Sequence, residues 1–169
     1  MTAARRRRKS WRLAAPFLLA LSGLWSGLFG CIPPLGAATT ERIVANPHTG
    51  LAIDGYDPVA YFTDAVAKLG RSEFELRHAG VTWRFRNLGN RAAFVANPNV
   101  FMPRFGGYDP TAVARGASAP GHPELWIIAE NQLYLFYSAA ARDTFKAAPD
   151  SIIEEAERVW PTVLHTLTP

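Results

Sequence analysis

The sequence is short of the residues on which many small active sites depend. It contains a single cysteine, Cys31, which lies in the N-terminal fifth of the 169 residues. The rest of the chain therefore has neither a disulfide nor a thiolate nucleophile or metal ligand. No two of its four histidines lie three to five residues apart, the spacing of a metal-ligand pair on a helix. The GxSxG motif and a glycine-rich phosphate loop are also missing, which excludes the corresponding hydrolases and nucleotide-binding proteins.

Acidic residues are missing from the first forty positions, which hold 6 of the 18 Lys and Arg residues. The rest of the chain has 12 basic and 14 acidic residues, a net charge of about −2. The sequence pI of about 9.6 therefore reflects the N-terminus alone. Without a basic patch to neutralise phosphates in the remaining chain, we expect no nucleic-acid partner.

The N-terminus, residues 1–38, has the pattern of a signal peptide or membrane anchor. The basic segment MTAARRRRKSWR precedes an apolar run, Leu13–Ile32, that is long enough to span a bilayer. Three outcomes are open: cleavage after Ala38, lipidation of Cys31 in the lipobox-like LFGC, or an uncleaved anchor. Each outcome predicts an exported domain, in the periplasm or on the periplasmic face of a membrane, with membrane contact only through this segment.

Residues 39–50 are polar and interrupted by Pro47 and Gly50, so they are interpreted as a linker before a domain at 51–169. Alternating apolar residues around Ala79-Gly80 and Glu130-Asn131 predict two β-hairpins. Each hairpin leads into a helix, capped by Asn87 or Ser138. A further helix at 151–160 is expected to break or kink at Pro161.

The tetrapeptide GYDP occurs at 55–58 and again at 107–110. A shift of 51 or 52 residues aligns both GYDP segments and both hairpin–helix units, and it places Trp83 on Tyr134 and Pro98 on Pro149. Either the unit is duplicated or similar units repeat the same turn chemistry. Duplication predicts an α+β domain of two units around a pseudo-twofold core. Each unit would contain a capped turn, a hairpin and a helix, and a C-terminal helix would follow.

Several segments, in this order, resemble the exported bacterial YHS domain-containing proteins: GYDPVAYF, WRFRNLGNRAAFVANPNVF, RFGGY, PGHPELWIIAENQLYLFYS and a final helix ending RVWP. The resemblance covers about 51–161. It implies a small α+β module, related to treble-clef-like metal-binding modules found beside copper-transport domains. It also implies binding of a metal or small ligand, without a defined reaction.

The chain departs from this family at its cysteines. Metal-binding relatives carry cysteines at positions that are Arg86 and Asn90 here, and Tyr137 and Ala141 in the second unit. Exported relatives commonly read GGYC where this chain has Asp109 after Gly106-Gly107-Tyr108. Because zinc and copper(I) sites use soft thiolate ligands, we expect the metal role to be lost or replaced by oxygen ligands. No metal-ligand set and no cofactor is assigned.

Five residues are candidates for ligand binding: Tyr56, Asp57, Tyr108, Asp109 and His122. Asp57 and Asp109 each precede a proline and can instead cap a helix. The tyrosines can line a pocket between the units or pack in the core, and His122 lies in a Pro/Gly loop. With no catalytic constellation, the leading interpretation is a non-enzymatic exported binding module for a small molecule, a metal complex or an envelope protein. The alternatives are a small metal-dependent enzyme or oxygen-ligand metal protein, and a structural envelope protein tethered to the membrane.

Overall fold

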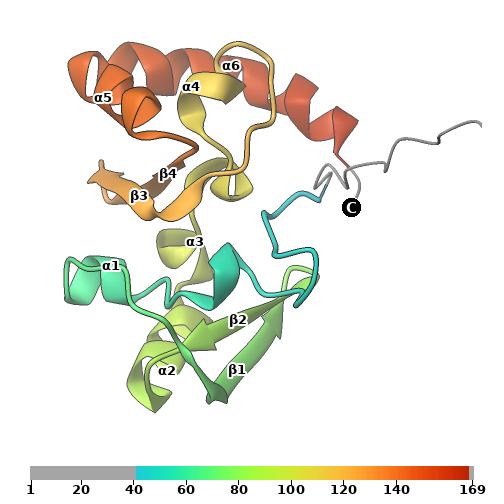
Figure 1. Ribbon diagram of the computed structural model, residues 1–169, viewed down its shortest axis with the longest axis vertical. Coiled ribbons are helices and arrows are strands. Elements are labelled where there is room, and N and C mark those ends of the chain that lie inside the picture. The colour runs from blue at the N-terminus through green and yellow to red at the C-terminus, as the bar shows by residue number, and fades with distance from the viewer. Residues whose placement is uncertain (1–40, 168–169) are drawn as a thin grey trace, which may run out of the picture. The chain divides into compact units, whose positions relative to one another are not determined.

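The structure is a computed structural model that describes residues 41–167 (Figure 1). Cys31, the proposed cleavage position after Ala38 and the apolar run lie outside the described residues. The described part confirms the α+β class, because it combines helices with two separate two-stranded antiparallel sheets and ends in a helix. None of the helices in residues 41–167 combines the length and the apolar character needed to cross a membrane.

The same order of elements occurs twice. The first copy, residues 51–101, contains η1 (Ile53–Gly55), α1 (Ala60–Thr63), β1 (Arg71–His78), β2 (Val81–Phe85), α2 (Leu88–Ala96) and α3 (Pro98–Phe101). The second copy, residues 103–152, contains η2 (Arg104–Gly107), α4 (Pro110–Val113), β3 (His122–Ala129), β4 (Gln132–Phe136), α5 (Ala139–Ala147) and the start of α6 (Pro149–Thr166). The repeat seen in the sequence is therefore a repeat of structure.

The two hairpins share even their irregularity. In the first hairpin Arg71 pairs with Phe85, and the register then shifts before Glu75 pairs with Arg84. In the second hairpin, His122 pairs with Phe136, and the same shift precedes the pairing of Trp126 with Leu135. A bulge is a specific feature rather than a general property of hairpins. Its recurrence 51 residues later supports duplication over a coincidence of turn chemistry.

Each copy holds its helix on its hairpin with three aromatic rings. The ring of Phe94 on α2 lies 5.1 Å from Trp83 and 5.2 Å from Phe85, between centroids. In the second copy, the ring of Phe145 lies 5.2 Å from Tyr134 and 5.1 Å from Phe136. All six side chains are buried. The alternating strand pattern produces this arrangement, because every second residue points to the helix-bearing face of its hairpin.

The single pseudo-twofold core expected from duplication is not found; two hydrophobic cores form instead. Tyr134 and Phe136, on one face of the second hairpin, belong to the second core. Leu133 and Leu135, on the opposite face, belong to the first core. The second hairpin therefore lies between the two cores, and the copies stack head to tail because only this hairpin is apolar on both faces.

The second core is covered by α6 rather than by another hairpin. Ile153, Ala156 and Trp160 of α6 pack in that core, and Figure 1 shows α6 running beside α4 and α5. Of the predicted break or kink at Pro161, the break is wrong, since α6 continues to Thr166. Pro161 is exposed, and Val163 and Leu167 beyond it are buried, so packing holds the helix together past the missing hydrogen bond.

The predicted linker is wrong for the part that the structure describes, residues 41–50. The backbone N–H of Val44 donates to the carbonyl of Gly106 at 2.8 Å, and the N–H of Ile53 donates to the carbonyl of Val44 at 3.2 Å. Ala45 forms a β-bridge with Ala52 and is only 5% exposed. Residues 41–45, called the strap below, thus join the two copies. The sequence did not predict this packing, because the residues next to Val44 and Ala45 are mostly polar.

Candidate functional site

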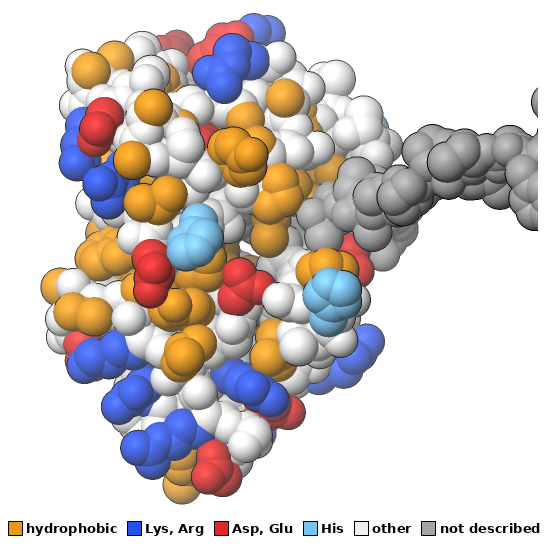
Figure 2. Space-filling model, in the orientation of Figure 1, with side chains coloured by type: hydrophobic (Ala, Val, Ile, Leu, Met, Phe, Trp, Pro, Cys, Tyr) orange, Lys and Arg blue, Asp and Glu red, His pale blue; other side chains and the backbone are white. Residues whose placement is uncertain are grey.

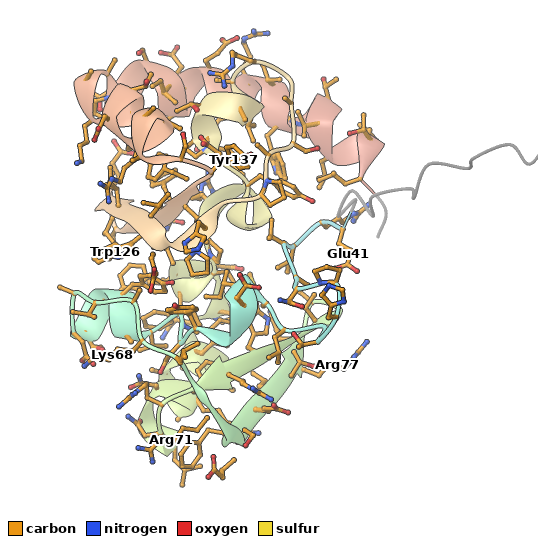
Figure 3. All side chains as sticks on the ribbon, viewed as in Figure 1. Glu41, Lys68, Arg71, Arg77, Trp126 and Tyr137 are labelled. Carbon is orange, nitrogen blue, oxygen red and sulfur yellow. The ribbon has the colours of Figure 1, made fainter. Side chains whose placement is uncertain are left out.

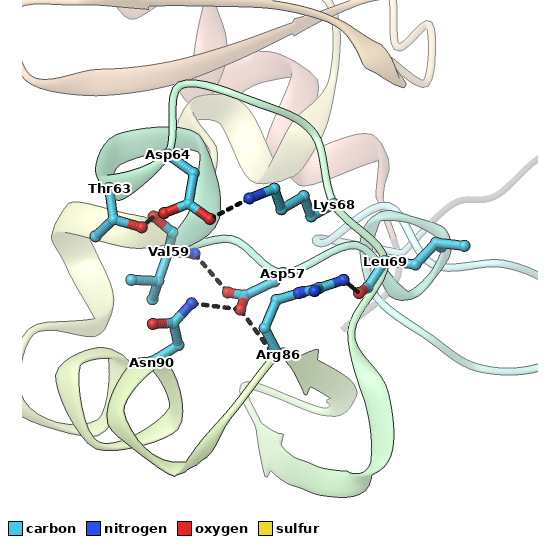
Figure 4. A network of polar contacts seen from close by, with 8 residues as sticks. All are labelled: Asp57, Val59, Thr63, Asp64, Lys68, Leu69, Arg86 and Asn90. Carbon is cyan, nitrogen blue, oxygen red and sulfur yellow. Dashed lines mark hydrogen bonds and ion pairs between the residues drawn. The ribbon is translucent and has the colours of Figure 1, made fainter.

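Asp57 of the first GYDP segment is fully buried, and protein donors occupy both of its carboxylate oxygens (Figure 4). Oδ1 accepts the backbone N–H of Val59 at 2.8 Å. Oδ2 accepts the backbone N–H of Arg86 at 2.7 Å and the side-chain amide of Asn90 at 2.6 Å. The carboxylate therefore ties the GYDP turn to the end of β2 and the start of α2.

Asp109 repeats this arrangement in the second copy. Its Oδ1 accepts from the N–H of Thr111 at 2.7 Å and from the Thr111 hydroxyl at 2.8 Å. Its Oδ2 accepts the backbone N–H of Tyr137 at 3.0 Å. Helix capping is confirmed for Asp109, which is the N-cap of α4. Asp57 bonds the amide of Val59 within its turn, whereas α1 begins at Ala60.

The long-range bond in each copy was not visible in the sequence. It joins Asp57 to Arg86 and Asp109 to Tyr137, residues separated by 29 and 28 positions. No local sequence motif predicts such a contact. Only the repeat spacing indicates that the two aspartates have the same role. Because buried carboxylates need several donors, the network accounts for both aspartates as structural residues.

Arg86 and Asn90, where the family resemblance places cysteines, both serve as donors to Asp57. In the second copy the corresponding Tyr137 donates its backbone N–H to Asp109. Within residues 41–167, no three His, Cys, Asp or Glu side chains come together as a group able to hold a metal ion.

Tyr56 and Tyr108, the two GYDP tyrosines, point to different partners. The Tyr56 hydroxyl donates to Oε1 of Glu124 at 3.0 Å. The Tyr108 hydroxyl is buried and donates to the carbonyl of Glu41 in the strap at 2.6 Å. Burial raises the pKa of Tyr108 to about 12, and the nearby Glu41 adds to that effect. Tyr108 therefore anchors the strap, while Tyr56 reaches the other copy.

His122 lies beside the partner of Tyr56. It begins β3, is exposed, and its Nδ1 accepts the backbone N–H of Glu124 at 3.2 Å. The acceptor role of Nδ1 assigns the proton of the neutral imidazole to Nε2, which is then a donor. On the other side, the buried Tyr61 donates its hydroxyl to the carbonyl of Pro123 at 2.9 Å. We call Tyr56, Tyr61, His122 and Glu124 the seam, because they join the copies.

Trp126 extends the seam into the core. Its ring lies 5.3 Å from that of Tyr61 in an edge-on contact, and Figure 3 shows Trp126 near the junction of the two copies. An edge-on pair of this kind stabilises beyond area burial alone. The seam is thus packed against aromatic side chains below and polar at its surface.

Negative charge surrounds the seam phenol. Partial burial raises the pKa of Tyr56 most, followed by the hydrogen bond and charge of Glu124 and then the charge of Asp54. Asp54 is held by the side-chain amide of Asn46 at 2.9 Å. Figure 2 shows acidic and histidine side chains near the middle of this face, around apolar surface. The phenol therefore stays protonated at neutral pH and acts as a hydrogen-bond donor rather than a base.

Of the five candidates from the sequence, the structure brings Tyr56 and His122 to one surface through Glu124. It turns Asp57, Asp109 and Tyr108 inward to backbone partners. Sequence reasoning missed Glu124 and Tyr61, since only the fold shows that β3 begins beside the first GYDP turn. No family model, curated protein or solved structure matches the chain.

Proposed function

We propose that this protein is an exported YHS-type binding module that acts without catalysis and takes a small ligand at the seam. One observation carries the proposal. Both GYDP carboxylates accept hydrogen bonds from donors within the protein. By contrast, polar atoms at a surface built from both copies are presented by Tyr56, His122 and Glu124.

The seam chemistry favours recognition over reaction. The Tyr56 phenol, whose pKa is raised, stays protonated at neutral pH and therefore does not act as a base. Among residues 41–167, the exposed His122 imidazole bonds a backbone amide rather than an orienting carboxylate. The same groups suit a ligand that both donates and accepts hydrogen bonds. The carboxylate of Glu124 accepts, and the Nε2–H of His122 donates.

The first test is the native mass and elemental content of the protein recovered after export with its own N-terminus. We expect an extra mass or a stoichiometric element, lost in Glu124→Gln and His122→Ala. Tyr137→Phe and His48→Ala are matched controls, because both residues are exposed and lie outside the seam. Recovery of the bare chain mass, or loss of the ligand in the controls as well, would contradict the proposal.

A further inference from the structure

A cleft lies between η2 and the middle of α6. Arg104, Phe105, Glu157, Trp160 and Pro161 line it, and its volume is about 230 Å³. It shares no residue with the seam. It forms where α6, rather than a hairpin, covers the second core, so the first copy has no counterpart with the same lining. Typical pockets for drug-sized ligands are larger, about 300–1,000 Å³, which restricts this cleft to a ligand with one ring.

The floor of the cleft is aromatic. The rings of Phe105 and Trp160 lie 5.5 Å apart, and Trp160 also lies 6.3 Å from the ring of Tyr108. Phe105 is only 5% exposed and is held at φ 54°, a backbone region unfavourable for a bulky side chain. The turn thus holds Phe105 in the lining of the cleft. A flat apolar group fits such a floor.

One charge of each sign lies at the rim. The guanidinium of Arg104 pairs with the carboxylate of Glu157, and their side chains are 40% and 49% exposed. Arg104 also lies 5.6 Å from the centre of the Phe105 ring. Because exposed ion pairs contribute little net stability, a ligand carrying both charges can replace this pair at small cost.

Pro161, which also lines the cleft, has no N–H to donate to the carbonyl four residues earlier, that of Glu157. At the rim, the Glu157 carboxylate accepts hydrogen bonds, and a ligand ammonium group supplies three donors.

We propose that this cleft binds a free aromatic α-amino acid as its zwitterion. The ligand carboxylate pairs with Arg104, the ammonium group pairs with Glu157, and the ring lies on Phe105 and Trp160. The inference is independent of the proposed function, because it uses a different surface and a different set of side chains.

The ligand series is measured on the full chain by isothermal titration, with L-phenylalanine as the probe. We expect saturable binding below about 10 mM, the range of a millimolar Kd. 3-Phenylpropionate lacks the ammonium group, 2-phenylethylamine lacks the carboxylate and L-alanine lacks the ring. Each should bind at least about five-fold more weakly. No binding of L-phenylalanine, or equal binding of any one analogue, would overturn the proposal.

Variants locate the site. Glu157→Gln and Arg104→Lys should each weaken L-phenylalanine binding at least about five-fold, since lysine lacks the planar fork of arginine. Glu155→Gln and Arg158→Met are matched controls, because they break a similar pair on the same helix outside the cleft. Binding unchanged in the cleft variants, or equally weakened in the controls, would refute the assignment. Near-ultraviolet circular dichroism checks that each variant is folded. If a variant is unfolded, the proposal is tested by the ligand series on the unaltered chain alone.

Discussion

The two hairpins have the same backbone arrangement, but the face that each turns away from its own helix differs. This face is apolar on the second hairpin and charged on the first. On the second hairpin the face turned toward the first copy carries Trp126, Ile128, Leu133 and Leu135, all of which pack in the first core. The four equivalent positions of the first hairpin, 51 residues earlier, are Glu75, Arg77, Thr82 and Arg84. Arg84 Nε and Glu75 Oε1 form an ion pair at 2.7 Å there. The four side chains on this face thus determine whether another copy can pack against the hairpin.

This difference explains why the outer face of the first hairpin is not suited to stacking on another copy. A charged face on the first hairpin cannot be buried against another copy without loss of hydration. At the other end α6 covers the second core with a helix. The arrangement follows the logic of repeat proteins, in which units share interfaces and the terminal units are altered.

The largest expected effect comes from exchanging the outer faces. Leu135→Arg places a charge in the first core, where Leu135 is fully buried. We expect a loss of about 4 kcal/mol or more, enough to unfold a small domain. Urea unfolding followed by circular dichroism measures it.

The reciprocal change, Arg84→Leu, is the control. Its effect on stability should be smaller than that of Leu135→Arg, because the Arg84 side chain is 34% exposed and its ion pair to Glu75 lies at the surface. It should instead promote self-association, visible by size-exclusion chromatography at rising concentration, since it extends an apolar surface. Similar destabilisation by both changes would mean that the two faces are equivalent after all.

The next effect concerns the strap, which contacts the second copy at Gly106. A Cβ at this position would lie 1.9 Å from the carbonyl oxygen of Arg42, and the φ of Gly106 is 63°. Gly106→Ala should therefore cost about 3 kcal/mol in thermal or urea unfolding. Gly80→Ala has a similar φ, 85°, with nothing within 4 Å of the added carbon, and should cost about 1 kcal/mol. Equal losses would show that the strap is dispensable.

The buried aspartates should behave alike in the two copies. Asp57→Ala and Asp109→Ala each leave buried backbone N–H groups without an acceptor. We expect each to lower the free energy of unfolding by about 2–4 kcal/mol. Asp64→Ala, an exposed carboxylate of the same copy as Asp57, should change it little. A large loss at one aspartate only would assign the other a role beyond structure.

The smallest effect comes from a mismatch between the copies. Arg91 Nε donates to the carbonyl of Glu75 at 3.0 Å, whereas the equivalent Arg142 Nε is buried with no hydrogen-bond partner among the described residues. Arg142→Met should therefore be neutral or stabilising by about 1 kcal/mol, and Arg91→Met destabilising by about the same amount. Differential scanning calorimetry on both variants gives the sign, and a reversed order would refute this interpretation.

The sequence was most informative where the chemistry is local. The turn residues Ala79-Gly80 and Glu130-Asn131 located both hairpins, and Asn87 and Ser138 are the helix caps that they were expected to be. These features depend on neighbours within four residues. The repeat spacing then predicted the architecture of the second copy from the first.

Contacts across the chain were the ones that could not be predicted. Whether Leu133 and Leu135 face their own core or the core of the other copy depends on how the copies stack. A strand that is apolar on both faces does not show in its sequence which face packs against which core. The strap was missed for a similar reason, since Val44 and Ala45 divide their packing between two cores. The seam depends on Glu124, whose partner Tyr56 lies 68 positions away.

The position of the second hairpin between the cores also sets an order of assembly. The first copy is synthesised first, yet its core includes Leu133 and Leu135. A nascent chain that ends before those leucines can form its first hairpin and α2 but leaves their apolar face open to solvent. Folding therefore cannot proceed copy by copy from the N-terminus, as it does for independent domains. The first copy can complete its core only after the second hairpin has been synthesised. Both cores therefore form only when nearly all of the chain is available.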